Sequence, residues 1–385
     1  MIAKSIVFFI IVVLLPEIYL DRRHYRKKAW WKRLLLWLPT LGMIIYAVAL
    51  AMERNFMPDD PFILYFYLFL LFVWFIPKAV YTLCSAIGWV ICKCLKKHSN
   101  YGNLIGLLLA ICVSGVAIYG LTAGFHQLEV QEVEYDSADL PEAFDGYRIV
   151  HFSDAHVGTL RGMHQGQLKR IVQAINDQDA DLVVFTGDLQ NTQPQDIYPA
   201  MDLLSSIHAK DSVYAVLGNH DYAEYVFCDE VEKVANCRET CSLIRQLGWI
   251  LLNNEHRTIT RGKESIVIAG MENDGEGPFP SKGDIEKTLQ GVGEHDFIVM
   301  LEHDPSAWRR VILPKSHAQI TLSGHTHGGQ FRVFGWSPVS LVSPEWLGRF
   351  DEGNQMLYIT AGVSGLVPFR FGMPAEIVVI TLKRK

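Results

Sequence analysis

Charged residues are scarce in this sequence of 385 residues, at 20% of the total, while 50% are hydrophobic and the mean hydropathy is +0.15. This composition excludes a disordered or fibrous protein, because such chains are polar or repetitive. The sequence also lacks internal repeats and low-complexity segments. It is more apolar than an average soluble enzyme, which indicates that part of the chain lies in a membrane.

Acidic residues are rare only in the first third of the chain. Residues 1–123 contain 5 Asp and Glu against 13 Lys and Arg, whereas residues 124–385 contain 36 acidic and 22 basic residues. We therefore expect two different domains, an apolar membrane anchor over 1–124 and a globular domain over 125–385. The acidic charge of the second domain argues against nucleic acid as a partner, because a polyanion needs a basic face.

Membrane-spanning helices are predicted wherever an apolar run approaches the roughly 20 residues needed to cross a bilayer. Four such runs cover residues 5–20, 34–52, 62–92 and 104–123. The third is too long for one simple span and carries Pro77 and Lys78 near its middle, so we expect it to tilt, to kink or to extend beyond the membrane. The first run has no small-residue cleavage site, which favours an uncleaved anchor over a secretory signal.

The loops between these runs predict the orientation in the membrane. Basic residues concentrate between the first two runs and between the last two, at Arg22, Arg23, Arg26, Lys27, Lys28, Lys32, Arg33, Lys93, Lys96 and Lys97. The other loop has Glu53, Arg54, Asp59 and Asp60. Basic loops remain in the cytoplasm, so the globular domain is predicted to be extracytoplasmic. The prediction inverts if residues 62–92 cross twice or if the first run does not cross.

The predicted membrane spans contain few ionisable side chains. Glu17 and Lys78 are the acidic and basic residues within the proposed runs, and both occupy positions where snorkelling or a helix break is expected. Transporters and channels depend on ionisable groups inside the membrane. An anchor is therefore favoured over a transporter or a receptor.

Short apolar runs alternate with amphipathic stretches from residue 125 onward, which predicts an α/β domain. The expected strands are 147–152, 182–186, 213–217, 266–269, 297–301, 320–322, 357–360 and 377–382. The expected helices are near 164–177, 195–207, 229–247 and 305–312. Residues 271–282, rich in Gly and Pro, are predicted to be a loop.

Five of these strands stop at residue types that bind metals. The residues are Asp154 and His156, Asp188, Asn219, His303, and the pair His325 and His327. In open α/β sheets, ligands bind beyond the carboxyl ends of the strands, so these side chains are expected to converge. Carboxylate and imidazole donors together suit divalent Zn, Mn, Fe or Co. The absence of Cys from the set argues against a structural zinc site.

The order of these motifs resembles the calcineurin-like metallophosphoesterases. The matching residues are Asp154-x-His156, Gly187-Asp188, Gly218-Asn219-His220-Asp221, His303 and Gly324-His325-x-His327. Residues 269–274, 324–330 and 368–377 more narrowly resemble the bacterial membrane-associated phosphodiesterase branch. The resemblance covers about residues 145–385, and it implies a four-layer α/β/β/α sandwich with a two-metal site at the strand ends.

The resemblance also implies a role for each residue of the site. One metal would be held by Asp154, His156, Asp188 and His327, and the other by Asp188, Asn219, His303 and His325. A metal-bridging hydroxide attacks phosphorus in this chemistry. His220 corresponds to the catalytic histidine of the family, and Asp221 is expected to orient its imidazole. Two departures from the family pattern are Ala155, where Leu is frequent, and Asn191, where a supporting Asp is usual.

The remaining histidines and Arg370 are given no catalytic role. His151 is expected in the core or at an edge, and surface positions are expected for His164, His208, His256, His295 and His317. Arg370 either reaches a substrate phosphate or forms an ordinary surface ion pair.

Two features of the globular domain stay open at this level. A disulfide among Cys228, Cys237 and Cys241 is permitted if the domain is extracytoplasmic. Residues 222–247 form either a flap over the site or a plain amphipathic helix.

The predicted function is that of a membrane-anchored, two-metal phosphohydrolase, preferably a phosphodiesterase or pyrophosphatase acting on a lipid-linked phosphoester. The alternatives are an inactive metal-binding scaffold and a phosphomonoesterase. The family includes UDP-diacylglucosamine pyrophosphatases, which act on a cytoplasmic substrate. The predicted topology places this site on the opposite side of the membrane.

Overall fold

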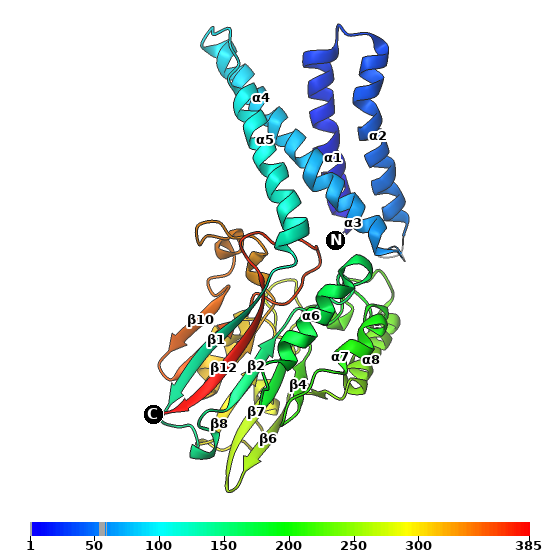
Figure 1. Ribbon diagram of the computed structural model, residues 1–385. Coiled ribbons are helices and arrows are strands. Elements are labelled where there is room, and N and C mark those ends of the chain that lie inside the picture. The colour runs from blue at the N-terminus through cyan, green and yellow to red at the C-terminus, as the bar shows by residue number, and fades with distance from the viewer. Residues whose placement is uncertain (1, 54–57, 59) are drawn as a thin grey trace. The chain divides into compact units, whose positions relative to one another are not determined.

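A computed structural model describes residues 2–53, 58 and 60–385, with side chains from residue 10 onward. The chain divides into two compact units, Met1–Ala123 and Gly124–Lys385. Each unit is visible in Figure 1, the first in blue to cyan and the second from green to red. Arg54 and Asp59 of the loop discussed above lie outside the described residues.

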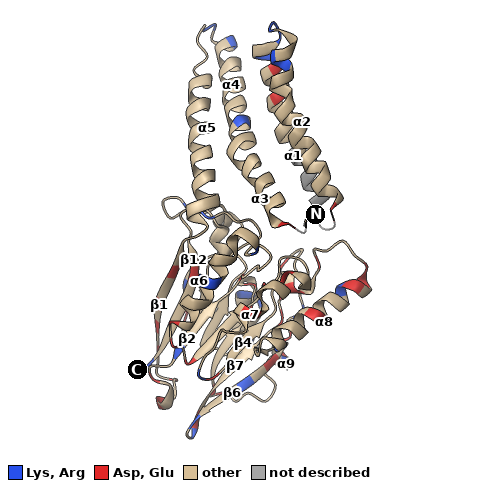
Figure 2. Ribbon diagram, turned by 45° about the vertical axis from the view of Figure 1, so that its right-hand side comes forward, with Lys and Arg blue, Asp and Glu red and all other residues tan. Residues whose placement is uncertain are grey.

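The first unit is helical and nearly free of charge along its helices (Figure 2). Its segments are α1 (Ile2–Leu20), η1 (Asp21–Tyr25), α2 (Trp30–Met52), α3 (Pro61–Leu70), η3 (Leu71–Phe75), α4 (Ile76–Cys94), α5 (Gly102–Tyr119) and η4 (Gly120–Gly124). Within the described residues, three helices are long and apolar enough to cross a membrane: Trp30–Met52, Pro61–Cys94 and Gly102–Gly124. The helix α1 is not among these three.

The long third run forms one helix of 34 residues, in which η3 is a turn of π-helix. Pro77 has no N–H to donate to the carbonyl of Val73 four residues earlier. Ser114 on α5 compensates, because its hydroxyl donates to that carbonyl at 3.0 Å. The helix is thus distorted near Pro77 by a turn of π-helix. The expected tilt, kink or extension beyond the membrane stays a prediction.

Glu17 and Lys78 pair with each other. Glu17 on α1 is fully buried, and its carboxylate accepts from the ammonium of Lys78 on α4. The hydroxyl of Thr40 on α2 donates to the same carboxylate at 2.6 Å. The expectation that these residues snorkel is wrong, because each finds an opposite charge inside the unit. Lys78 does lie beside a break in the helical pattern, since it follows η3 and Pro77. The pair ties three helices together.

The second unit is built on two six-stranded sheets. The first sheet runs in the order β1 (Leu128–Ser137), β12 (Ala375–Arg384), β2 (Arg148–Phe152), β3 (Leu182–Thr186), β4 (Val213–Val216), β5 (Ile250–Leu251). The second runs in the order β10 (Gly348–Glu352), β11 (Gln355–Ile359), β9 (Ile320–Ser323), β8 (Phe297–Leu301), β7 (Glu264–Gly270), β6 (Glu255–Arg261). Strands β2 to β5 are mutually parallel, as are β7, β8, β9 and β11.

Helices and short helical turns connect these strands. They are η5 (Glu142–Phe144), η6 (Gly162–His164), α6 (Gln165–Asn176), η7 (Pro194–Asp196), η8 (Tyr198–Ala200), α7 (Met201–Leu204), η9 (Asn219–Tyr222), α8 (Glu230–Gln246), α9 (Ile285–Thr288), η10 (Trp308–Ile312), α10 (Leu313–Lys315), η11 (His327–Gly329) and η12 (Pro338–Leu341).

The alternation of side chains along each strand produces the layers. On β3, Leu182 and Val184 enter the core between the two sheets, whereas Val183 and Phe185 enter the core under the helices. On α6, the apolar stripe of Leu168, Ile171, Val172 and Ile175 covers that outer face. On the far side, Trp308 packs against the outer face of the second sheet. The predicted four-layer α/β/β/α sandwich is confirmed.

The apolar strands predicted from the sequence are all present, within a few residues at each end. The predicted helices near 164–177 and 229–247 are α6 and α8, and residues 271–282 are a loop. The predicted helix over 195–207 breaks into η8 and α7, and 305–312 holds a π-helical turn. Four strands were not predicted: β1, β5, β6 and β10.

The stretch 222–247 is mainly the helix α8, whose Leu243 and Ile244 join the core. The flap interpretation is therefore wrong for residues 230–246. All seven cysteines are free, so no disulfide joins Cys228, Cys237 and Cys241.

Candidate metal centre

The seven predicted ligand residues converge beyond the carboxyl ends of five strands drawn from both sheets. Asp154 and His156 follow β2, Asp188 follows β3, Asn219 follows β4, His303 follows β8, and His325 and His327 follow β9. Neighbouring strand ends are tied together by backbone hydrogen bonds. The N–H of Asp154 donates to Gly187 at 2.9 Å, and that of His156 donates to Asp188 at 3.1 Å. The convergence therefore follows from the parallel pairing of the strands.

Backbone strain is concentrated at this site. Five of the seven residues have a positive φ: Asp154 (55°), His156 (37°), Asp188 (61°), His325 (69°) and His327 (51°). Such conformations cost free energy and persist where the surroundings enforce them, typically at functional sites. Gly324 shows how tight the site is, because a Cβ at this position would lie 2.3 Å from a carboxylate oxygen of Asp154.

A first group of four side chains forms a compact donor set. The ligand atoms of Asp154, His156, Asp188 and His327 all lie within 4.8 Å of one another. His327 Nε2 is 3.4 Å from Asp154 Oδ1, and His156 Nε2 is 3.5 Å from Asp188 Oδ2. His156 Nε2 and His327 Nδ1 are buried without a hydrogen-bond partner. Buried polar nitrogens need partners, so this arrangement fits a bound cation.

A second group shares Asp188 with the first. His303 Nε2 lies 3.3 Å from Asp188 Oδ2 and 3.1 Å from Asn219 Oδ1. His325 Nδ1 lies 2.8 Å from the same Asn219 oxygen. The other ring nitrogen of His303 donates to the carbonyl of Thr186 at 2.6 Å, which fixes the direction in which Nε2 points. Asp188 thus stands between the two groups.

The protonation of three of the four ligand histidines also suits metal binding. Burial lowers the pKa of His156, His325 and His327, so these imidazoles are neutral and have a lone pair to offer. Burial also acts to lower the pKa of His303, but the adjacent Asp188 carboxylate outweighs it and raises the pKa to about 10, so His303 is protonated at neutral pH and would release this proton on binding a cation. Neutral imidazoles and carboxylates are the donors that borderline divalent cations prefer.

His220 lies beside the first group but outside it. Its ring packs edge-on against His156, with the centroids 4.9 Å apart. The backbone N–H of His220 donates to Asp188 Oδ1 at 2.8 Å. Its Nδ1 donates to the carbonyl of Asn191, which leaves Nε2 as the ring nitrogen for other partners.

Asp221 does not contact the imidazole of His220, so the expected orienting role is wrong. Its carboxylate accepts four backbone N–H groups instead, from Gly218 (2.9 Å), Asp188 (2.8 Å), Leu189 (3.0 Å) and Gln190 (3.3 Å). Asp221 therefore fixes the turn that carries Asp188. The carbonyl of Asn191 orients His220, and because every residue type supplies a carbonyl, Asn in place of Asp leaves this contact intact.

Comparison with known proteins agrees with the geometry. The family described as "Calcineurin-like phosphoesterase" matches residues 147–329, and the one described as "Probable Calcineurin-like phosphoesterase, transmembrane domain" matches residues 3–125. The "Uncharacterized metallophosphoesterase YkuE" of Bacillus subtilis is 30% identical over 302 residues, covering 76% of this chain and 99% of the relative. The chain belongs to the calcineurin-like phosphoesterases.

Two further relatives of this phosphoesterase come from a vertebrate and from another bacterium. A zebrafish (Danio rerio) "Transmembrane protein with metallophosphoesterase domain" is 30% identical over 294 residues, which cover 74% of this chain and 64% of the relative. The "UDP-2,3-diacylglucosamine pyrophosphatase LpxG" of Chlamydia trachomatis is 26% identical, covering 62% of this chain and 85% of the relative. The protein is a membrane-associated, metal-dependent phosphoester hydrolase.

Three side chains near the centre of the phosphoesterase domain were not predicted from the sequence. The hydroxyl of Tyr225 accepts from Asn219 Nδ2 at 2.8 Å, and its ring lies 4.5 Å from that of His220. Gln190 Nε2 donates to the His220 carbonyl at 2.9 Å, and the hydroxyl of Thr240 on α8 donates to Gln190 Oε1 at 2.8 Å. Tyr225 and Gln190 each lie within a few residues of a recognised motif, which is the one signal that would have indicated them.

Arg370 neither faces a substrate nor forms a surface ion pair, so both expectations for it are wrong. It is buried, and it donates to the carbonyls of Ala361 (2.9 Å), Gly362 (2.9 Å), Ser364 (2.5 Å) and Pro374 (2.8 Å). Burial lowers its pKa to about 10, so it remains protonated at neutral pH. The loop that it holds packs against Asp154, because a Cβ on Gly362 would lie 2.7 Å from that residue's Cβ.

The other histidines follow the expectations in part. His151 is buried and bonds the hydroxyl of Thr186, as a core histidine does. His164 is buried against Phe125, so its predicted surface position is wrong. His208 and His295 are exposed as predicted, and His256 and His317 are half-buried.

Proposed function

We propose that this phosphoesterase is a two-metal hydrolase of lipid-linked phosphodiesters or pyrophosphates. Asp154, His156, Asp188 and His327 would hold one divalent cation, and Asp188, Asn219, His303 and His325 the other. The observation that carries the proposal is the position of Asp188, whose Oδ2 lies within 3.5 Å of imidazole nitrogens in both groups. A shared carboxylate is what two cations about 3.5–4 Å apart require.

The cations would supply an activated water and neutralise charge on the phosphoryl oxygens. Hydrolysis breaks a P–O bond, adds the water oxygen to phosphorus and leaves a proton for the departing oxygen. We assign that proton transfer to His220, whose Nε2 has no role in holding the turn. Support comes from the Nδ1 contact with Asn191, which fixes the tautomer and the direction of the ring.

The lipid-linked part of the proposal is supported by an exposed apolar loop beside the site. Residues 331–342 follow the η11 turn that carries His327, and four large apolar side chains on them are exposed: Phe334, Trp336, Leu341 and Val342. This loop packs back on the turn, because the hydroxyl of Ser337 donates to the Gly328 carbonyl at 3.1 Å. An exposed apolar patch beside a reactive centre suits a substrate with acyl chains. The name of the Chlamydia relative specifies a diacylated substrate.

The first test measures hydrolysis of bis-p-nitrophenyl phosphate and p-nitrophenyl phosphate by the full-length protein in detergent with Mn²⁺. We expect diester turnover that His220→Ala and His325→Ala abolish, whereas His208→Ala, at an exposed histidine, retains it. Preference for the monoester would instead establish a phosphomonoesterase. Absence of turnover of both esters by a metal-loaded protein would favour the inactive scaffold.

The second test concerns the apolar loop. We expect Phe334→Ser with Leu341→Ser to raise KM for a diacylated nucleotide pyrophosphate while leaving turnover of the soluble diester unchanged. Val231→Ser with Val234→Ser removes exposed apolar side chains on α8 and serves as the control. Equal effects on both substrates would contradict a role for the loop in lipid binding.

We also propose that the catalytic domain is extracytoplasmic. The basic loops follow α1 and α4, and the polypeptide leaves the membrane unit after α5. This orientation requires α1 to cross the membrane together with the three long apolar helices. We infer that it does, because the match to the transmembrane family begins at residue 3 and so includes α1. A reporter fused after Lys385 should be active only on the extracytoplasmic side. A cytoplasmic reporter would overturn this proposal and remove the topological objection to a cytoplasmic nucleotide-lipid substrate.

A further inference from the structure

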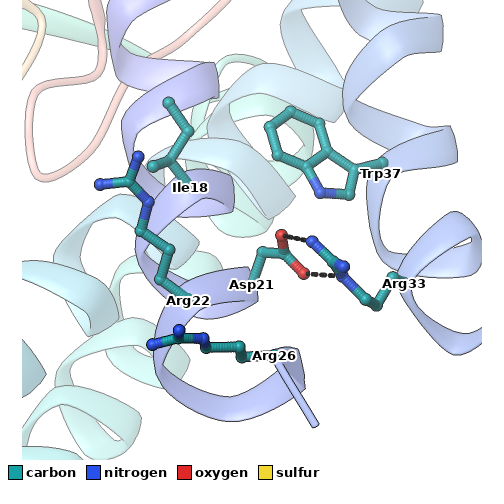
Figure 3. Close-up of a pocket in the computed structure, with 6 residues that line it drawn as sticks. All are labelled: Ile18, Asp21, Arg22, Arg26, Arg33 and Trp37. Atoms are coloured by element: carbon teal, nitrogen blue, oxygen red, sulfur yellow. Dashed lines mark hydrogen bonds and ion pairs between the residues drawn. The ribbon is translucent and has the colours of Figure 1, made fainter. Parts of the chain in front are cut away.

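A cavity lies in the membrane unit, where α1 ends and α2 begins. It has a volume of about 700 Å³ and is lined by Ile18, Asp21, Arg22, Arg26, Arg33 and Trp37 (Figure 3). A volume of this size is typical of sites for small ligands. All six residues belong to Met1–Ala123, so the cavity shares no residue with the metal centre.

The charge of the lining is unbalanced. Asp21 is the one acid, and Arg33 neutralises it through two hydrogen bonds, from Nε at 2.7 Å and from a terminal nitrogen at 2.6 Å. Figure 3 shows these bonds as dashed lines, and none leads to Arg22 or Arg26. Within the described part of the chain, neither of those two arginines has an ion-pair partner. With three arginines and one aspartate, the lining carries a net charge of +2.

No acid on α1 can balance this charge. Glu17, one helical turn before Asp21, is already held by Lys78 and Thr40. Glu17 of α1 and Asp21 of η1 are thus satisfied by basic or hydroxyl groups of other helices, while Arg22 and Arg26 remain exposed. Guanidinium groups bind phosphate oxygens strongly and with defined geometry, so the expected ligand is a phosphate group.

The position of the cavity indicates where that phosphate comes from. Arg33 and Trp37 lie in the first two turns of α2, a helix long and apolar enough to span the membrane. Trp is enriched at the level of lipid head groups, and Ile18 adds an apolar wall. Basic pockets between helices at this depth suit anionic lipids. We propose that this cavity binds the phosphate head group of an anionic membrane lipid.

The test measures lipid retention by the full-length protein in detergent, using native mass spectrometry with phosphatidic acid, phosphatidylglycerol and phosphatidylcholine. We expect the two anionic lipids to be retained over phosphatidylcholine. Arg22→Gln with Arg26→Gln should weaken this retention about tenfold or more. Lys27→Gln with Lys28→Gln removes the same charge from exposed residues of the loop outside the cavity, and should change retention little.

Two outcomes would overturn the proposal. Equal weakening by both double variants would show diffuse attraction to the basic loop and no specific site. Protection against thermal unfolding by inorganic phosphate, at the same concentration and to the same degree as by phosphatidylglycerol, would show a site for free phosphate. The helical circular dichroism of each variant and its elution as a single species in detergent confirm that the membrane unit is folded. If the double variant is not folded, Arg26→Gln alone, at an exposed position, repeats the test.

Discussion

At the scale of single residues, the carboxylate of Asp221 anchors four backbone N–H groups. We expect Asp221→Asn to destabilise the domain by about 2 kcal/mol or more, because an amide keeps one acceptor oxygen and turns an NH₂ group toward buried donors. The measurement is thermal unfolding of the metal-free protein. Unchanged stability combined with lost activity would show that the carboxylate serves His220 after all.

A second prediction at this scale concerns the contribution of the buried Arg370 to stability. Arg370→Met should leave buried carbonyls unpaired and lower the free energy of unfolding by about 3 kcal/mol or more. Arg370→Lys should recover part of this loss, because an ammonium group reaches fewer carbonyls. KM for the diester should remain near the wild-type value in folded Arg370→Lys. A raised KM with normal stability would instead place this side chain on the substrate.

The seven residues proposed as metal ligands could be predicted to lie together because each follows an apolar strand in a motif of defined spacing. Sequence reasoning misassigned Asp221 and Arg370 because a buried polar side chain is understood through its partners, and those partners are backbone groups that leave no pattern in the sequence. Tyr225 was missed for a related reason, since its contact with Asn219 arises from the path of a loop.

At the scale of elements, the distorted membrane helix depends on a contact with its neighbour. Ser114→Ala should destabilise the membrane unit by about 0.6 kcal/mol, since the Val73 carbonyl then lacks a donor in an apolar surrounding. Pro77→Ala restores an N–H four residues after Val73. In that background Ser114→Ala should therefore cost less, which a double-mutant cycle of unfolding in detergent measures. Additive effects of the two substitutions on the free energy of unfolding would show that Ser114 does not compensate for the N–H that Pro77 lacks.

The helix α8 supports the turn that carries His220 through one hydroxyl. Thr240→Val keeps the shape of the side chain but removes the hydrogen bond to Gln190, whose side chain holds the His220 carbonyl. We expect kcat for the diester to fall about tenfold with little change in KM, since a small displacement of the reacting groups is costly. The buried Gln190 Oε1 loses its donor, so the free energy of unfolding should also fall by about 1 kcal/mol or more. Thr240→Ser retains the hydroxyl and should restore the rate.

The buried central strands could be predicted from the sequence, whereas the strands at the edges of the sheets could not. The central strands are continuous apolar runs because both of their faces are covered, as β3 and β8 show. The strand β1 is largely exposed and polar, and β6 and β10 are edge strands of similar character, so none of them gives a clear apolar pattern. The predicted helix over 195–207 is broken because Pro199 interrupts it.

At the scale of the whole molecule, metal binding should be coupled to the stability of the catalytic unit. Chelation with EDTA should abolish hydrolysis and lower the unfolding temperature of Gly124–Lys385, because a ligand of the folded state stabilises it by mass action. Added Mn²⁺ should restore both, and His325→Ala should reduce the restoration. Hydrolysis that persists after complete chelation would contradict the assigned chemistry.

The architecture as a whole was inferred through the resemblance of the motifs, because apolar periodicity alone indicates an α/β domain without defining its sheets. The order of strands in the first sheet could not be derived from local patterns, since β12 inserts between β1 and β2 from the far end of the chain. The membrane unit was predictable in outline, but the pairing of Glu17 with Lys78 depends on how three helices meet.

That insertion of β12 has a consequence for biosynthesis. Leu128 pairs with Ala375, so the first strand of the catalytic unit finds its neighbour only when the last strand has left the ribosome. Until then β1 and β2 both expose unpaired edges, which favour aggregation. The nascent catalytic unit therefore completes its fold only after translation has passed Arg384, while it is already tethered by its membrane helices. A premature stop codon before residue 375 should yield a chain that protein quality control degrades.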